Sequence, residues 1–324
     1  MAAVSTIPAT LRLGGTRRLR DRLGDRLLFL LTLLASLIAI GAMVAIAYKV
    51  FHGAWPAIQD FGLGFLTSSA WDVNKSAFGA LPGLYGTAIT SFFALLIGGP
   101  LAIAIALFLS ELAPGAVRGV IGPLVEMLAA IPSVVLGLWG ILVLGPFVAK
   151  HIEPWLSKTF GFIPIFSGDG QSSGIFIAIL VLSIMIVPIV ASICRELFLA
   201  VPRELEEGAL ALGATRWELV RGVVLSSSRP GIAAALILGL GRALGEAIAV
   251  TQVIGAGWRI DKSLYDPGDT LASRIASQFQ GAQTKEQTAA LFYLAAILLV
   301  IGLVTNLAAQ LIVRRFDVHR AGAR

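Results

Sequence analysis

The chain has 324 residues, of which 57% are hydrophobic and 14% are charged, and its net charge is +6. So much apolar surface excludes a soluble monomer, and we expect one integral domain with membrane lipid as its surroundings. The positive charge does not indicate nucleic-acid binding, because the basic residues are spread over separate segments without an interleaved aromatic surface.

Six apolar stretches are long enough to cross about 30 Å of hydrocarbon, and they predict an all-α membrane protein with six transmembrane helices. The predicted spans are Leu27–Tyr48, Gly86–Leu109, Val120–Val148, Gly174–Ile193, Gly231–Ile254 and Thr288–Val313. The first apolar stretch is too long for a cleaved signal peptide, so we interpret it as an anchor.

The distribution of lysine and arginine predicts cytoplasmic N- and C-termini. With that orientation sixteen of these residues lie on the cytoplasmic side and eight outside, in agreement with the positive-inside rule. The predicted organisation is a basic tail at 1–26, an integral membrane domain at 27–313 and a basic tail at 314–324. The outward segments 49–85, 150–173 and 255–287 either receive an extracytoplasmic partner or cap the bundle, and composition leaves both readings open.

Within the third predicted span, Pro132 predicts a kink and Glu126 is the only charge. Cys194 is the only cysteine, so no intrachain disulfide and no thiolate metal cluster can form, and we interpret it as a core residue. The three histidines are scattered without the spacing of metal ligands, and we expect no metal site.

The longest cytoplasmic loop, 195–229, predicts two helices joined by an elbow. Pro202 marks a helix start, and the acidic residues that follow suit the positive end of a helix dipole. Gly213 predicts the C-terminus of this helix, because glycine readily takes the left-handed conformation found there. Thr215 and Glu218 have the spacing of a capping box and predict the second helix.

This loop carries five basic and five acidic residues, and its neutrality argues against a DNA-reading helix-turn-helix. Leu205, Ala209 and Leu212 recur at helical spacing on one side of the first helix. They predict either a docking surface for another protein or a compact loop that lies on its own bundle.

Arg242 and Glu246 lie inside the fifth predicted span, where each charge costs about 2.5–3.5 kcal/mol if it faces lipid. Their spacing of four residues predicts one helical face on which they pair. One interpretation is a structural ion pair. The other is that Arg242 binds a passing oxyanion through its forked donors, while Glu246 orients Arg242 or accepts the hydrogen of a protonated oxyanion.

The loop resembles the EAA loop of ATP-binding-cassette (ABC) importer permeases, in which Glu-Ala-Ala is followed at fixed spacing by Gly, Ile and Leu-Pro. The matching residues here are Glu207, Gly208, Ala209, Gly213, Val223 and Leu225, with Gly208 in place of an alanine and Ser226 in place of the proline. The resemblance implies that Glu207, Ala209, Gly213 and Thr215 lie at the contact with a separate ATPase.

Further strings resemble the PstC family, the permease subunits of ABC phosphate importers. They are Phe78–Pro82, Tyr85–Thr87, Ser110–Pro114, Ala130–Ser133, Gly137–Gly140 and Leu238–Glu246. The resemblance implies that 27–313 is a permease domain and that Arg242 and Glu246 act in phosphate passage. The implied partners are a PstA-like second permease, a PstB-like ATPase dimer and a PstS-like phosphate-binding protein.

The sequence contains no Gly-x-x-x-x-Gly-Lys-Ser/Thr loop, so we expect ATP and magnesium to bind the partner ATPase and this chain to hold no cofactor. We find no nucleophile, base or metal set among the predicted spans and therefore expect a permease subunit of the bacterial cytoplasmic membrane, not an enzyme. The alternatives are a permease for molybdate or sulfate, a secondary transporter or channel that works alone, and a membrane-embedded enzyme or receptor.

Overall fold

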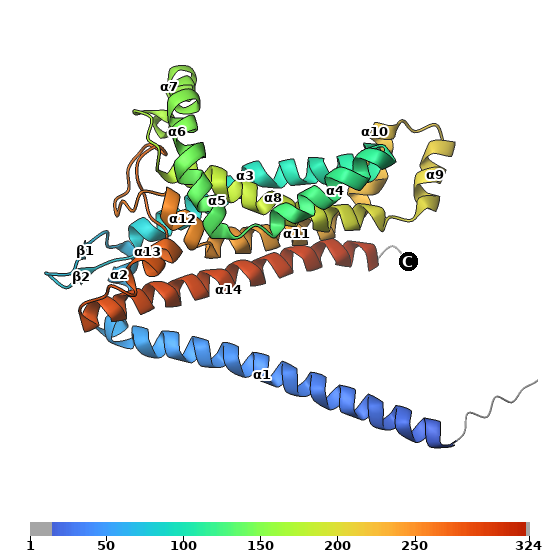
Figure 1. Ribbon diagram of the computed structural model, residues 1–324, viewed down its shortest axis with the longest axis horizontal. Helices are drawn as coiled ribbons and strands as arrows, with labels where there is room; N and C mark the ends of the chain where they lie inside the picture. The colour runs from blue at the N-terminus through green and yellow to red at the C-terminus, as the bar shows by residue number, and fades with distance from the viewer. Residues whose placement is uncertain (1–14, 322–324) are drawn as a thin grey trace, which may run out of the picture. The chain divides into compact units, whose positions relative to one another are not determined.

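The computed structural model describes residues 15–321 (Figure 1). Residues 1–14 and 322–324, which belong to the two predicted basic tails, lie outside the described residues. The chain forms two compact units, Met1–Lys49 and Val50–Arg324. In the part of the chain that the structure describes, six helices are long and apolar enough to span a membrane, which confirms the predicted all-α membrane fold.

The long helices are α1 (Gly15–Phe61), α3 (Leu81–Leu107), α4 (Gly115–Ala129), α8 (Ile175–Leu199), α11 (Leu225–Gly245) and α14 (Lys285–Ala321). The short helices are α2 (Gly64–Thr67), α5 (Ser133–Trp139), α6 (Gly145–Phe147), α7 (Glu153–Phe160), α9 (Arg203–Ala211), α10 (Arg216–Leu219), α12 (Ile248–Val253) and α13 (Leu271–Gln278). Single π-helical turns η1 (Phe108–Leu112), η2 (Gly140–Leu144), η3 (Val148–Ile152) and η5 (Val220–Val224) extend or join these helices, and η4 (Pro164–Phe166) is a 3₁₀ turn. Strands β1 (Trp71–Asp72) and β2 (Ala77–Phe78) form a small antiparallel hairpin in which Trp71 pairs with Phe78.

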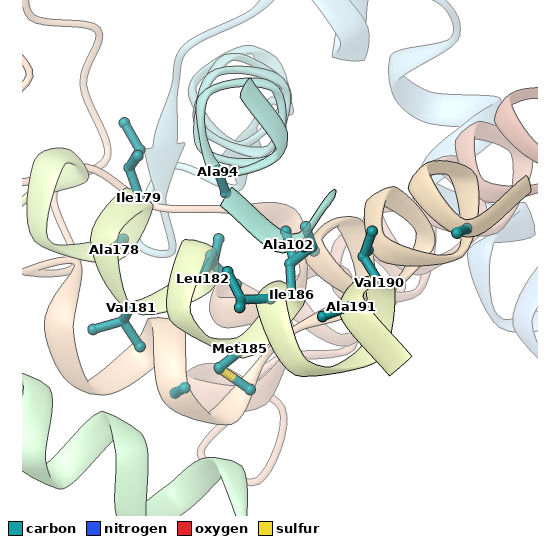
Figure 2. Close-up of a cluster of buried hydrophobic side chains, with 14 of the residues drawn as sticks. Ala94, Ala102, Ala178, Ile179, Val181, Leu182, Met185, Ile186, Val190 and Ala191 are labelled. Atoms are coloured by element: carbon teal, nitrogen blue, oxygen red, sulfur yellow. The ribbon is translucent and has the colours of Figure 1, made fainter. Parts of the chain in front are cut away.

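Helix α8 is the central helix of the second unit, and most of its span is buried. Helices α3 and α11 pack against it, and α14 packs against α11 (Figure 1). Small residues bring α3 and α8 close together: Ser183 Oγ donates to the Ala94 carbonyl at 3.3 Å, and a Cβ at Gly98 would meet the Ser183 carbonyl at 2.9 Å. Figure 2 shows Ala94 of α3 in one cluster with branched side chains of α8 such as Leu182. Such close approach supplies the dispersion contacts that hold membrane helices together.

A buried ion pair joins the segment before α13 to α13 itself. Arg274 Nε lies 2.8 Å from Asp269 Oδ2, and both side chains are almost fully buried. The Arg274 guanidinium also lies 4.2 Å from the ring centroid of Trp258 and 5.4 Å from that of Trp71. Pairing and cation–π contacts offset part of the cost of burying this charge. The cluster therefore ties the hairpin and the loop before α13 to one helix.

The predicted third span, Val120–Val148, is wrong. Helix α4 ends at Ala129, and Pro132 begins α5 with extended backbone angles (φ −58°, ψ 136°). A proline lacks the N–H that a continuing helix needs and disfavours helical angles at the residue before it, so it ends the helix instead of kinking it. The spanning helix is Ser133–Phe160, which makes the first part of the predicted outward segment 150–173 helical. The 15 residues of α4 reach only about 22 Å, too short to cross the membrane.

The predicted fifth span, Gly231–Ile254, is wrong at both ends. The spanning helix runs from Arg216 to Gly245, because α10, η5 and α11 follow one another without a break. The second helix of the predicted cytoplasmic loop is therefore the beginning of the span, not a separate short helix. At the other end the chain leaves the helix at Glu246, and α12 is a distinct element.

Candidate functional site

The elbow at Gly213 has the geometry that the sequence predicts. Gly213 has φ +86°, its N–H donates to the Leu210 carbonyl at 2.9 Å, and the Ala214 N–H donates to the Ala209 carbonyl at 3.1 Å. This pair of hydrogen bonds is the Schellman motif, which satisfies the last carbonyls of α9. A residue other than glycine has a strained backbone at this φ, so the turn depends on Gly213.

The capping box that follows is also confirmed. The Glu218 N–H donates to Thr215 Oγ1 at 3.3 Å, and the Thr215 N–H donates to a Glu218 carboxylate oxygen at 2.8 Å. These bonds satisfy two donors at the start of α10. Buried Leu219 and Val220 then anchor the helix in the core. The direction in which the chain leaves the elbow is therefore fixed by local hydrogen bonds and by packing.

Helix α9 packs only loosely on its own bundle. None of its nine residues is buried, and the apolar face predicted from the sequence is largely open, with Leu205 52% and Leu212 91% exposed. Trp217 at the start of α10 is also 67% exposed. Large apolar side chains together on a surface are typical of a protein contact. This exposure favours the docking reading over a loop that lies on its own chain.

Partial burial and, secondarily, the charge of Glu111 in η1 raise the pKa of Glu206 above its ordinary value. Two residues of the predicted ATPase contact, Glu207 and Ala209, lie on the same helix as Glu206. Glu207 is exposed and Ala209 is half-buried. The structure thus brings the four predicted coupling residues together on one short helix and its elbow.

Arg242 and Glu246 are paired, but not in the way that the sequence predicts. Arg242 Nη2 lies 3.8 Å from Glu246 Oε2. The prediction that both residues lie on one continuous helical face is wrong, because α11 ends at Gly245 and Glu246 has extended backbone angles (φ −71°, ψ 116°). The second carboxylate oxygen, Oε1, accepts a hydrogen bond from the Ala249 N–H at 3.2 Å. Glu246 therefore joins the end of α11 to the first turn of α12.

The two charged side chains differ in their surroundings. The Arg242 side chain is 39% exposed, whereas that of Glu246 is 8% exposed. Arg242 faces a cavity of about 490 Å³, which we call the α11–α14 cavity. Its lining comprises Ile189 of α8, Ile237, Leu238, Gly241, Arg242 and Leu244 of α11, and Gly302, Thr305 and Asn306 of α14. Glu246 does not line it.

The sequence did not predict Thr305 and Asn306 as site residues. They are a polar pair in a helix whose spanning window is otherwise strongly apolar, and that contrast was the available signal. The charge predicted inside the third span and the single cysteine both have structural roles. Glu126 pairs with Arg195 of α8 at 2.9 Å, and Cys194 is fully buried in the core.

Residues 98–318 match the family described as "Binding-protein-dependent transport system inner membrane component". The chain is similar to the phosphate transport system permease protein PstC of Mesorhizobium japonicum, with 40% identity over 94% of both chains. It is also similar to that of Pasteurella multocida, with 40% identity over 85% of this chain and 87% of the relative.

Among solved structures, the fold resembles a chain of a bacterial alginate ABC transporter in complex with an alginate-bound periplasmic protein. The TM-score is 0.57 at 22% identity, over 91% of this chain and 97% of that one. The likeness in fold, the six spanning helices and the family match identify a multi-pass protein of the cytoplasmic membrane. The chain belongs to the family of binding-protein-dependent transport system inner membrane components, the permease subunits of ABC transporters.

Proposed function

We propose that this chain is the transmembrane permease subunit of an ABC importer that moves inorganic phosphate across the cytoplasmic membrane. The observation that supports an oxyanion substrate is the position of the Arg242 guanidinium, which lines the α11–α14 cavity among three spanning helices. A guanidinium offers forked donors that match the oxygens of a tetrahedral anion. The 40% identity to chains named as phosphate transport permeases supports phosphate among the oxyanions.

The geometry of Glu246 supports a positioning role. Its carboxylate is buried and accepts from the backbone of α12 while it pairs with Arg242. This contact orients the guanidinium and partly neutralises its charge, so that an anion binds but also leaves. Arg242 is thus the residue that meets phosphate, and Glu246 holds it.

The partners follow from the elbow and from the family. The exposed apolar residues around Gly213 form the surface that docks a PstB-like ATPase dimer, on which ATP and magnesium bind. Glu207, Ala209, Gly213 and Thr215 form the core of this contact. A PstA-like second permease completes the membrane passage, and a PstS-like binding protein delivers phosphate from outside.

The test is uptake of labelled phosphate by vesicles that contain the complete complex. Arg242→Gln removes the forked cation. We expect uptake to fall at least about tenfold, because at least one charge-assisted hydrogen bond to the anion is lost. Arg242→Lys keeps the charge without the fork and should retain partial uptake. Co-purification of the ATPase checks assembly. Wild-type uptake by an assembled Arg242→Gln complex would remove this residue from the pathway.

A further inference from the structure

The α14 side of the α11–α14 cavity carries two polar side chains, Thr305 and Asn306. Thr305 Oγ1 donates its hydrogen to the Ile301 carbonyl one turn earlier, which leaves only its oxygen lone pairs for a ligand. Asn306 is exposed, and among the residues that the structure describes its amide has no hydrogen-bond partner. An amide without partners is unfavourable in hydrocarbon, so this residue requires a polar partner.

A protonated tetrahedral oxyanion needs two kinds of protein group. Its ionised oxygens accept hydrogen bonds, which Arg242 can donate. Its hydroxyl group must donate to an acceptor. Glu246 is not that acceptor, because its side chain is almost fully buried outside the cavity lining, where it pairs with Arg242 and accepts from the Ala249 N–H. The acceptors that do line the cavity are Thr305 and Asn306.

We infer that Asn306 is a substrate-contacting residue of the permease and that it binds a hydrogen phosphate ion from the α14 side of the α11–α14 cavity. Its amide N–H donates to an ionised oxygen, and its carbonyl accepts the hydrogen of the P–OH group, with the Thr305 oxygen as a second acceptor. A fully ionised oxyanion such as sulfate has no hydrogen to donate and leaves these acceptors unpaired. The inference rests on the proposed role of Arg242.

A different role for Asn306 would be a hydrogen bond to the second permease, since amides join membrane helices in this way. The two roles differ in how Asn306 and Arg242 combine. Groups that bind the same ion are coupled, so the effect of losing one depends on whether the other is present. A contact with another subunit is independent of Arg242.

The experiment measures phosphate uptake by vesicles that contain the complete complex, for Asn306→Leu, Arg242→Lys and both changes together. Gln310→Leu is the matched control, because it removes an amide from α14 one turn away and outside the cavity lining. We expect Asn306→Leu alone to slow uptake about tenfold, the loss of a hydrogen bond to a charged ligand. In the Arg242→Lys background the same change should cost about twofold or less. Gln310→Leu should transport like the wild type.

If the Asn306→Leu permease does not assemble with the ATPase, a second variant tests the same inference. Asn306→Asp keeps the shape, and its carboxylate repels the anion, so we expect uptake to be lost at neutral pH and partly recovered in acidic medium. Wild-type uptake by either variant would overturn the inference, as would an equal loss with and without Arg242→Lys. If Arg242→Gln and Asn306→Leu both transported normally, the proposed function of the cavity itself would fail. If Arg242→Gln lost uptake but Asn306→Leu transported like the wild type, the inference about Asn306 would fail while the proposed role of Arg242 stood.

Discussion

Replacement of Gly213 by valine tests whether the elbow couples this chain to its ATPase. The φ of +86° costs a residue with a side chain about 1–2 kcal/mol, and a branched residue at least that much. A Cβ at this position would meet no atom within 4 Å, so the effect is conformational and not a clash. A penalty of about 1–2 kcal/mol lowers the ratio of the native elbow to other conformations by a factor of roughly 5–30.

The assay is the amount of ATPase that co-purifies with the permease, together with phosphate-stimulated ATP hydrolysis. We expect Gly213→Val to lose most of both. Gly213→Asn should be much milder, because asparagine tolerates the left-handed region. Gly208→Ala is the matched control: this glycine is helical and solvent-exposed, and a Cβ there also meets nothing within 4 Å. Wild-type retention of the ATPase by Gly213→Val would refute the reasoning.

Three further changes probe the start of α10, the buried ion pair and the cavity. Thr215→Ala removes the hydroxyl acceptor of the capping box and should destabilise the first turn of α10 by about 1 kcal/mol. Hydrogen exchange of the amides in that turn should become faster, and unchanged exchange would contradict the prediction. Arg274→Met leaves Asp269 buried without its cation and should lower the unfolding free energy by about 3–5 kcal/mol in a thermal scan of the solubilised protein. Addition of Asp269→Asn should restore most of that loss, and an unchanged Tm in the single variant would show that the pair contributes nothing. Gly302→Val places a branched side chain in the α11–α14 cavity, at a position where a Cβ would meet no atom within 4 Å, and should slow phosphate uptake at least about tenfold. Normal uptake would exclude this cavity from the pathway.

The sequence predicts best what is decided by neighbours along the chain. Gly213, Thr215 and Glu218 fall within one short segment, and a C-terminal glycine followed by a capping box leaves few alternatives for its backbone. The number of spans was predictable for a similar reason, since about 20 apolar residues are needed to cross the bilayer. Both predictions are confirmed.

Helix ends within apolar stretches could not be predicted in the same way. Hydropathy does not distinguish one long helix from two shorter ones, and Pro132 is compatible with a kink as well as with an end. The break at Glu246 depends on local contacts that the spacing does not reveal: the carboxylate pairs back to Arg242 and accepts from the Ala249 N–H, which compensates the chain for leaving the helix. A four-residue spacing is equally compatible with a continuous helix. Asn306 was missed because it lies 64 positions beyond Arg242, and only the packing of α14 on α11 places both at one cavity.

The helix break changes what Glu246 can do. On a continuous helix its carboxylate would share the Arg242 face and would compete for that guanidinium with any anion in the passage. In the structure it is almost fully buried and accepts from the α12 backbone, so it balances part of the charge without lining the cavity. An arginine held in this way keeps donors free for a ligand, and its reduced net charge weakens binding enough for release. In the proposed passage, the break therefore separates the residue that positions the cation from the cavity in which the anion moves.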